Sequence, residues 1–158
     1  MVGASVCLSA SNVNFLFLQA IDEQWIFDSI LANYLHRIKI VIRGTKNVQY
    51  LSGDYEGKTG RMVAAQKAPE GLEQTARVQF FDTGEERSFA VKYITPQEPK
   101  FSGEEVLVLD GKLKGMVLLV REKPDIDEMI AVSSRQNPVN FDYVPKRNMV
   151  ALTEESPS

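Results

Sequence analysis

The sequence predicts an all-β protein made of two small tandem barrels that follow a short helical segment. Three observations predict this fold class. Apolar residues alternate with period two from Arg37 onward, glycine-centred turns separate short apolar runs, and one internal repeat is present. The 158 residues suffice for one compact domain or two small β modules. The hydrophobic fraction of 44% and the charged fraction of 25% are ordinary for a globular protein.

Four segments are expected along the chain. Residues 13–35 carry apolar side chains at three- and four-residue spacing, which predicts one or two short helices. Residues 95–100 hold two prolines, which are incompatible with a helix or a central strand, so a linker is expected there. The division is therefore a helical or irregular segment at 1–36, a first barrel at 37–97, a second barrel at 98–153 and a disordered polar tail at 154–158.

Short strands and turns are expected to build both barrels. Ile38, Ile40 and Ile42 alternate with other residues as in a half-buried strand. The turn Asp82-Thr83-Gly84 lies between two strand-like runs and predicts a hairpin. The remaining expected elements are strands at 75–81 and 88–94, a strand-turn-strand unit at 105–120, a loop at 123–128, and final strands near 129–133 and 147–152.

The internal repeat relates two stretches that are 58 residues apart. This period exceeds the range of solenoid repeats and only two copies are present, which favours two barrels over a repeat array. VQYLSGDYEGKTGRMV (48–63) aligns with VLVLDGKLKGMVLLVR (106–121), pairing Val48 with Val106, Gly53 with Gly111, Gly57 with Gly115, and Met62 with Val120.

The stretch SGDYEGKTGRMV (52–63) contains Gly-Lys-Thr and an upstream glycine, as a phosphate-binding P-loop does. A P-loop has four residues between its two glycines, whereas three separate Gly53 from Gly57. Asp54 and Glu56 would repel phosphate oxygens, and no helix start follows. The pattern therefore argues against an NTPase. It predicts a tight reversal between two strands, with glycines that allow positive φ.

Gly53, Gly57 and Gly60 have the spacing of the KOW motif, and the second copy keeps Gly111 and Gly115 but has Leu118 in third place. Over residues 25–152 the chain resembles the KOW-repeat portion of the eukaryotic NusG-type transcription elongation factor, with fungal relatives most alike. The stretches that carry the resemblance are WIFDSI (25–30), RIKIVIRGT (37–45), LSGDYEGKTGRMV (51–63), VKYITP (91–96) and EEVLVLDGKLKGMVLLVRE (104–122).

The resemblance implies two SH3-like KOW barrels in a nuclear binding protein. Its implied partners are RNA polymerase II or other transcription elongation proteins, and single-stranded RNA or DNA. The net charge is −3, yet residues 37–67 hold seven Lys and Arg against two acids, so a local basic strip is expected. The predicted contact residues on and beside the barrel turns are Arg43, Lys46, Lys58, Arg61, Lys67, Lys112 and Lys114.

Two alternatives stay open beside this interpretation. The stretch VQFFDTGEERSFAVKYITP (78–96) also resembles the hairpin of Tudor barrels, which bind methylated Lys or Arg through an aromatic cage. The candidate cage residues are Tyr55, Phe81 and Tyr93, whereas most other aromatics of this region are expected in the core. The second alternative is a protein-protein adaptor that binds no nucleic acid.

Several other classes of function find no support in the sequence. One cysteine and one histidine cannot build a disulfide framework or a His/Cys metal cluster. No nucleophile elbow or calcium-loop pattern occurs, so catalytic residues, cofactors and a small-molecule substrate are not expected. No apolar run approaches the ~20 residues of a membrane span, and no secretory signal is expected.

Overall fold

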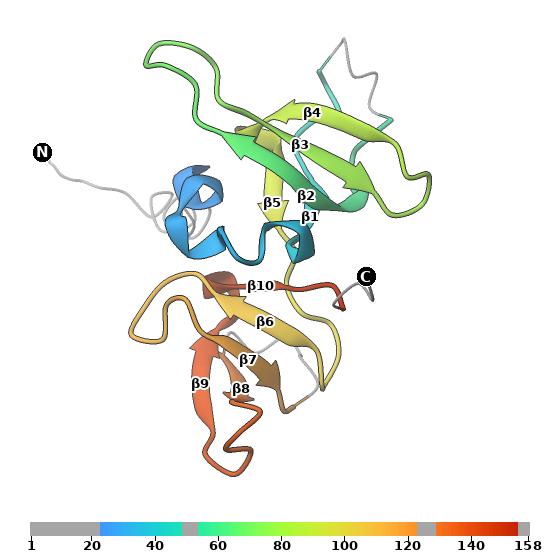
Figure 1. Ribbon diagram of the computed structural model, residues 1–158. Helices are drawn as coiled ribbons and strands as arrows, with labels where there is room; N and C mark the ends of the chain where they lie inside the picture. The colour runs from blue at the N-terminus through green and yellow to red at the C-terminus, as the bar shows by residue number, and fades with distance from the viewer. Residues whose placement is uncertain (1–22, 49–53, 123–128, 155–158) are drawn as a thin grey trace, which may run out of the picture.

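The computed structural model describes residues 23–48, 54–122 and 129–154 and contains two five-stranded antiparallel sheets, each curled into an SH3-like barrel (Figure 1). The all-β prediction is confirmed. The first barrel comprises β1 (Lys39–Ile42), β2 (Thr59–Gln66), β3 (Thr75–Phe80), β4 (Glu86–Ala90) and β5 (Ile94–Pro96). The second comprises β6 (Glu105–Val108), β7 (Val117–Val120), β8 (Met129–Ser133), β9 (Asp142–Pro145) and β10 (Met149–Ala151).

Both barrels have the same strand order. The first sheet runs β4-β3-β2-β1-β5 and the second runs β10-β6-β7-β8-β9, which is the same order traced from the other edge. Each strand therefore has a counterpart, β1 with β6, β2 with β7, and so on to β5 with β10.

The part of the chain that the structure describes contains no helix with the length and apolar character of a membrane span.

The hairpin predicted at Asp82-Thr83-Gly84 joins β3 to β4. Gly84 has a φ of +75°, and its N–H donates to the carbonyl oxygen of Phe80 over 2.9 Å. The strand expected at 88–94 is interrupted, however, by the 3-10 turn η5 (Val91–Tyr93). The turn redirects the chain so that β5 pairs with β1 and the sheet curls over its core. Pro96 is tolerated in β5 because β5 is an edge strand. Residues 95 and 96 of the expected linker at 95–100 thus belong to a strand of the first barrel.

The repeat prediction is confirmed at the second aligned glycine pair. Gly57 and Gly115 have φ values of +78° and +88°. Their N–H groups donate to the carbonyl oxygens of Ile42 and Val108, each over 2.8 Å. Ile42 is thus the counterpart of Val108, and the predicted pairing of Val48 with Val106 is wrong. The reason is that residues 43–58 connect β1 to β2, whereas the connection of β6 to β7 needs only 109–116.

Gly60 has a different role from the turn role predicted for it. It lies inside β2, opposite Phe80 of β3, and its φ is not positive. A Cβ at this position would collide with the backbone carbonyl of Gln79. Glycine is needed here because the backbones of two strands approach closely, next to an irregularity between Met62 and Ala64.

The helical segment consists of 3-10 turns that lie between the barrels (Figure 1). Residues 13–22 of the predicted helical stretch lie outside the described residues. Trp25, Ile26 and Leu31 are buried in a first core that also takes in Leu107 and Val150 of the second barrel. This segment therefore joins the two barrels through apolar packing. Its turns are η1 (Glu23–Phe27), η2 (Ser29–Leu31) and η3 (Leu35–Arg37).

Backbone hydrogen bonds add to the seam between the barrels. The Ala151 N–H donates to the carbonyl oxygen of Gln97 over 2.8 Å, and the Thr153 N–H donates to Arg37 over 2.7 Å. Ile38 and Leu152 form an isolated antiparallel bridge. A second core belongs to the second barrel alone, and its members include Val106, Leu118, Val120, Ile130, Val132, Val144 and Met149.

Candidate partner-binding groove between the barrels

Three of the seven predicted basic contact residues are engaged within the protein. The Lys58 ammonium lies 3.3 Å from Asp82 and covers the rings of Tyr55 and Phe80, at 5.7 and 5.2 Å from their centroids. Arg61 donates two hydrogen bonds to the side-chain oxygen of Gln79, over 2.9 and 2.7 Å.

Lys114 is the third engaged residue. It forms an ion pair with Asp28 over 2.8 Å, and this contact raises the pKa of the Lys114 ammonium and lowers that of the carboxyl group. Gly115 lies beside Ile30, so the second glycine turn packs on the helical segment. This turn therefore contributes a structural contact within the chain.

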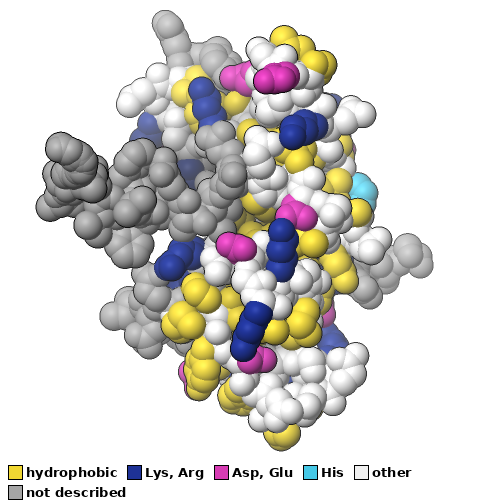
Figure 2. All heavy atoms as spheres, turned by 90° about the vertical axis from the view of Figure 1, so that its left-hand side faces the viewer, with side chains coloured by type: hydrophobic (Ala, Val, Ile, Leu, Met, Phe, Trp, Pro, Cys, Tyr) yellow, Lys and Arg dark blue, Asp and Glu magenta, His cyan; other side chains and the backbone are white. Residues whose placement is uncertain are grey.

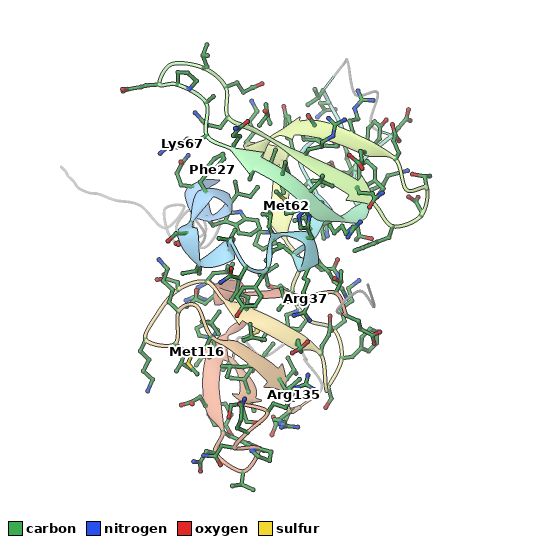
Figure 3. All side chains as sticks on the ribbon, in the orientation of Figure 1. Phe27, Arg37, Met62, Lys67, Met116 and Arg135 are labelled. Atoms are coloured by element: carbon green, nitrogen blue, oxygen red, sulfur yellow. The ribbon has the colours of Figure 1, made fainter. Side chains whose placement is uncertain are left out.

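The other predicted basic residues are exposed at separate places. Arg43 and Lys46 lie on the long first connection, and Lys112 lies on the short second one. Lys67 follows β2, beside Phe27 in Figure 3, whereas Lys58 precedes this strand. The eight residues of β2 separate the two ends by about 26 Å. The structure therefore does not gather Lys58 and Lys67 into one patch.

The three predicted cage residues lie in different surroundings. Tyr55 stacks on the buried Phe80 at a centroid distance of 5.4 Å, and the Arg87 guanidinium covers its ring at 4.8 Å. Phe81 lies in the turn that follows β3, and its side chain is about half exposed, outside this cluster. Tyr93 packs beside Gly44 and under the Lys92 ammonium. The expectation that most aromatics of this hairpin belong to the core is confirmed by Phe80 and Phe89.

A groove of about 630 Å³ lies where the two barrels meet. Phe81 and Lys39 come from the first barrel, whereas Phe101 lies on the segment that enters the second. Phe81 and Phe101 are 48% and 66% exposed, so two large aromatic side chains border one concave surface. The other lining residues are Gly103, Glu104, Glu105, Arg135, Leu152, Thr153 and Glu154.

Glu104 organises one wall of this groove. Its carboxylate accepts hydrogen bonds from the backbone N–H groups of Lys100, over 2.8 Å, and Phe101, over 3.1 Å. It also accepts one from the Lys39 ammonium over 3.2 Å. These three bonds fix the chain that carries the exposed Phe101 and connect it to β1. The backbone at Phe101 is thereby held, while its side chain stays exposed.

Glu105 forms a charge network on the same wall. Arg37 contacts its carboxylate over 2.5 Å and Arg135 over 3.1 Å. Burial acts to raise the pKa of Glu105, but the hydrogen bonds and charges of Arg37 and Arg135 outweigh it, so the pKa is lowered. Arg135 is largely exposed, and exposed ion pairs contribute little to stability. The Arg135–Glu105 ion pair therefore adds little to the stability of this wall.

Sequence reasoning identified Phe81 but missed the rest of this groove. Phe101 follows the expected linker, and Glu104 and Glu105 open the second barrel, where the sequence pattern predicted no binding role for them. Their proximity to Phe81 depends on how the two barrels pack, which local pattern does not encode. Within the described residues, no group of three or more His, Cys, Asp or Glu is arranged to hold a metal ion.

No protein-family model matches the chain, and no curated protein matches its sequence. Among solved structures it is similar to the crystal structure of Arabidopsis thaliana AGDP1 AGD34, with a TM-score of 0.32 and 10% identity over 83% of this chain and 90% of that chain. It is also similar to the SHH1 SAWADEE domain in complex with an H3K9me3 peptide, with a TM-score of 0.28 and 12% identity over 75% of this chain and 98% of that chain.

Likenesses at these scores carry no functional argument. The SH3-like part of the KOW resemblance is confirmed by the fold itself. The link to a transcription elongation factor stays a prediction.

Proposed function

We propose that this chain is a protein-binding module whose groove between the barrels receives a lysine- or arginine-containing segment of a partner. The observation that carries the proposal is the pair of exposed rings, Phe81 and Phe101, which come from different barrels and border one groove. Concave sites lined by aromatic groups and a few polar groups are the usual places for ligand recognition.

The charges around the two rings favour a cationic side chain. Three carboxylates, those of Glu104, Glu105 and Glu154, line the groove together with two cations, Lys39 and Arg135. A cation near an aromatic face gains about 0.5–2 kcal/mol, depending on how far it is desolvated. The cation of the partner lies against Phe81 and Phe101, and takes the position of the exposed Arg135 beside Glu105.

A peptide explains the geometry better than a nucleic acid does. The carboxylates of the groove would repel a phosphate backbone. Lys58, Arg61 and Lys114 have partners within the chain, which weakens the predicted basic surface. The methyl-lysine alternative remains compatible with the groove, because methylation keeps the charge and adds apolar surface for the rings. The predicted cage of Tyr55, Phe81 and Tyr93 is replaced by the pair Phe81 and Phe101.

The KOW resemblance adds an expectation about where the partner acts. A nuclear protein that accompanies RNA polymerase II would find cationic peptide segments on polymerase subunits, elongation factors and histones. This finer assignment is a prediction, and it would be tested by capturing nuclear proteins with the wild type and with Phe101→Ala in parallel.

The decisive test compares three fluorescein-labelled 12-residue peptides in an anisotropy titration. They share a Gly/Ser frame and differ at one central residue, which is lysine, trimethyl-lysine or the uncharged norleucine. The two cationic peptides are expected to bind up to about 30-fold more tightly than the norleucine peptide, since 2 kcal/mol corresponds to this ratio.

Matched variants locate the site. Phe101→Ala and Phe81→Ala are expected to weaken binding of the cationic peptides. Phe141→Ala removes a phenylalanine of the same exposure, 47% against 48% for Phe81, outside the groove, and should leave binding unchanged. The proposal would be overturned if the norleucine peptide bound as tightly as the two cationic peptides. It would also be overturned if Phe141→Ala weakened binding as much as Phe81→Ala and Phe101→Ala do. Binding of a 20-nucleotide RNA that depends on Arg43 and Lys46 would favour the nucleic-acid interpretation instead.

A further inference from the structure

A second surface, which shares no residue with the groove, carries exposed apolar side chains. Val139, Phe141 and Tyr143 are 82%, 47% and 61% exposed. Val139 and Phe141 precede β9, and Tyr143 lies in it. Alternate residues of an extended chain share one face, so Phe141 and Tyr143 form a short row, named here the β9 row. Val139 lies in the turn just before it, which a hydrogen bond from the Asn140 N–H to the carbonyl oxygen of Asn137 closes over 3.3 Å. Val144 faces the other way and is buried in the second core. Figure 2 faces the side on which β9 lies and shows hydrophobic side chains gathered over the second barrel.

A small cavity of about 160 Å³ adjoins the β9 row and has room for about one side chain. Tyr143 belongs to both, because it ends the row and lines the cavity. The glycine turn between β6 and β7 supplies the opposite wall, with Gly111 at a φ of +92°. The remaining lining residues are Val108, Asp110, Lys112, Leu113, Val144, Pro145 and Asn148.

The position of Pro145 limits how a partner can bind here. β9 is an edge strand, and edge strands commonly accept a partner segment as an added strand. Proline has no N–H, so a strand added along β9 finds no donor at Pro145. Strand addition depends on main-chain hydrogen bonds for its affinity, and this edge is therefore poorly suited to it.

A polyproline II helix does not have this requirement. It forms no internal hydrogen bonds, needs none from a sheet edge, and is recognised by aromatic-lined grooves. Phe141 and Tyr143 are about 7 Å apart along the strand, and one turn of polyproline II advances about 9 Å. Successive turns of such a segment can therefore lie on the two rings while one proline enters the cavity beside Leu113.

We propose that the β9 row and its cavity bind a proline-rich segment of a protein partner in the polyproline II conformation. This site is independent of the groove between the barrels and shares no lining residue with it. The chain then presents one site for a cationic segment and another for a proline-rich segment. A partner that carries both gains avidity wherever its linker spans the two sites.

The test titrates fluorescein-labelled decaproline into the ¹⁵N-labelled protein, with amide shifts and anisotropy as the measurements. Saturable shifts are expected at Gly111, Tyr143 and Asn148. Tyr143→Ala should weaken binding roughly tenfold, as loss of an aromatic anchor does. Phe141→Ala, a second variant at an exposed site, should weaken it as well. Leu72→Ala, which removes an exposed side chain that belongs to neither site, should leave it unchanged.

Two results would overturn this proposal. One is no saturable binding of decaproline, or binding that Tyr143→Ala leaves intact. The other is preferential binding of a ten-residue alternating Val/Thr peptide, which would show that β9 accepts an added strand. Either result would leave the proposal for the groove unaffected, because that proposal is tested by the binding of cationic peptides to the Phe81→Ala and Phe101→Ala variants.

Discussion

The two barrels use the same glycine turn in different ways. Gly57 and Gly115 make equivalent hydrogen bonds to the first strand of their barrels, over the same distance. In the first barrel the long connection is held internally, since the Glu56 carboxylate accepts hydrogen bonds from Thr45 N–H, over 2.7 Å, and Thr45 Oγ1, over 2.9 Å. In the second barrel the short connection packs on the helical segment through Lys114 and Asp28. Shared backbone geometry therefore does not imply shared surface function.

The two cores differ as well. The first core extends from the helical segment through the first barrel into the second, and Leu107 and Val150 are among its buried members. The second core contains side chains of the second barrel alone. We infer that the second barrel is fixed to the first, which the groove requires because its two rings come from both sides.

The largest expected effect tests the shared core. Leu107→Ala should lower the free energy of unfolding by about 2–5 kcal/mol. Trp25, the single tryptophan, lies in this core, so its fluorescence during urea denaturation reports the loss directly. Ile130→Ala removes a comparable side chain from the second core and should shift the Trp25 transition less. Equal shifts in the two variants would contradict the distinction between the cores.

A smaller effect separates the two roles of glycine in the first barrel. Gly60→Ala forces a Cβ against the Gln79 carbonyl and should cost about 1–3 kcal/mol. Gly57→Ala meets only the end of the Arg43 side chain and mainly suffers positive φ, which costs about 1–2 kcal/mol. Urea denaturation should therefore rank Gly60→Ala as the less stable variant. The reverse order would show that β2 and β3 can separate easily at this point.

The smallest effect concerns pH and the long first connection. Hydrogen bonds from the Thr45 backbone lower the pKa of Glu56 below its ordinary value of 4.5. A lowered pKa means that this carboxylate stabilises the folded state above pH 4.5 and loses this effect as the pH falls through its folded pKa. Glu56→Gln should therefore lower the Tm at pH 7, and the difference from wild type should shrink at acidic pH. A Tm difference that is constant with pH would assign Glu56 a purely steric role.

Local pattern was enough to predict most of the strands but not the site. The alternation of Ile38, Ile40 and Ile42 and the turn at Gly84 depend on neighbours in sequence, and the structure has both features. β9 was missed because it follows an Asn- and Pro-rich stretch and because Val139, Phe141 and Tyr143, the apolar residues before and within it, face solvent. The basic turn residues were assigned to partners because charge pattern cannot reveal that Asp28 lies beside Lys114.

Glu56 also has a structural role that the sequence pattern did not reveal. As a sequence feature it served to exclude a P-loop, because a carboxylate repels phosphate. In the structure it holds residues 43–48 against the glycine turn through Thr45, a contact between positions eleven residues apart. The groove is harder still to predict from local sequence, because Phe81 and Phe101 border one surface only when both barrels are folded and packed together.

The most direct test of the central claim is the affinity of the lysine peptide for the wild type, Phe101→Ala and Phe141→Ala, measured by anisotropy under identical salt. The account predicts that Phe101→Ala weakens binding severalfold or more while Phe141→Ala matches the wild type. If both variants bind the lysine peptide as the wild type does, or if both lose affinity to the same extent, the groove between the barrels is not the partner-binding site.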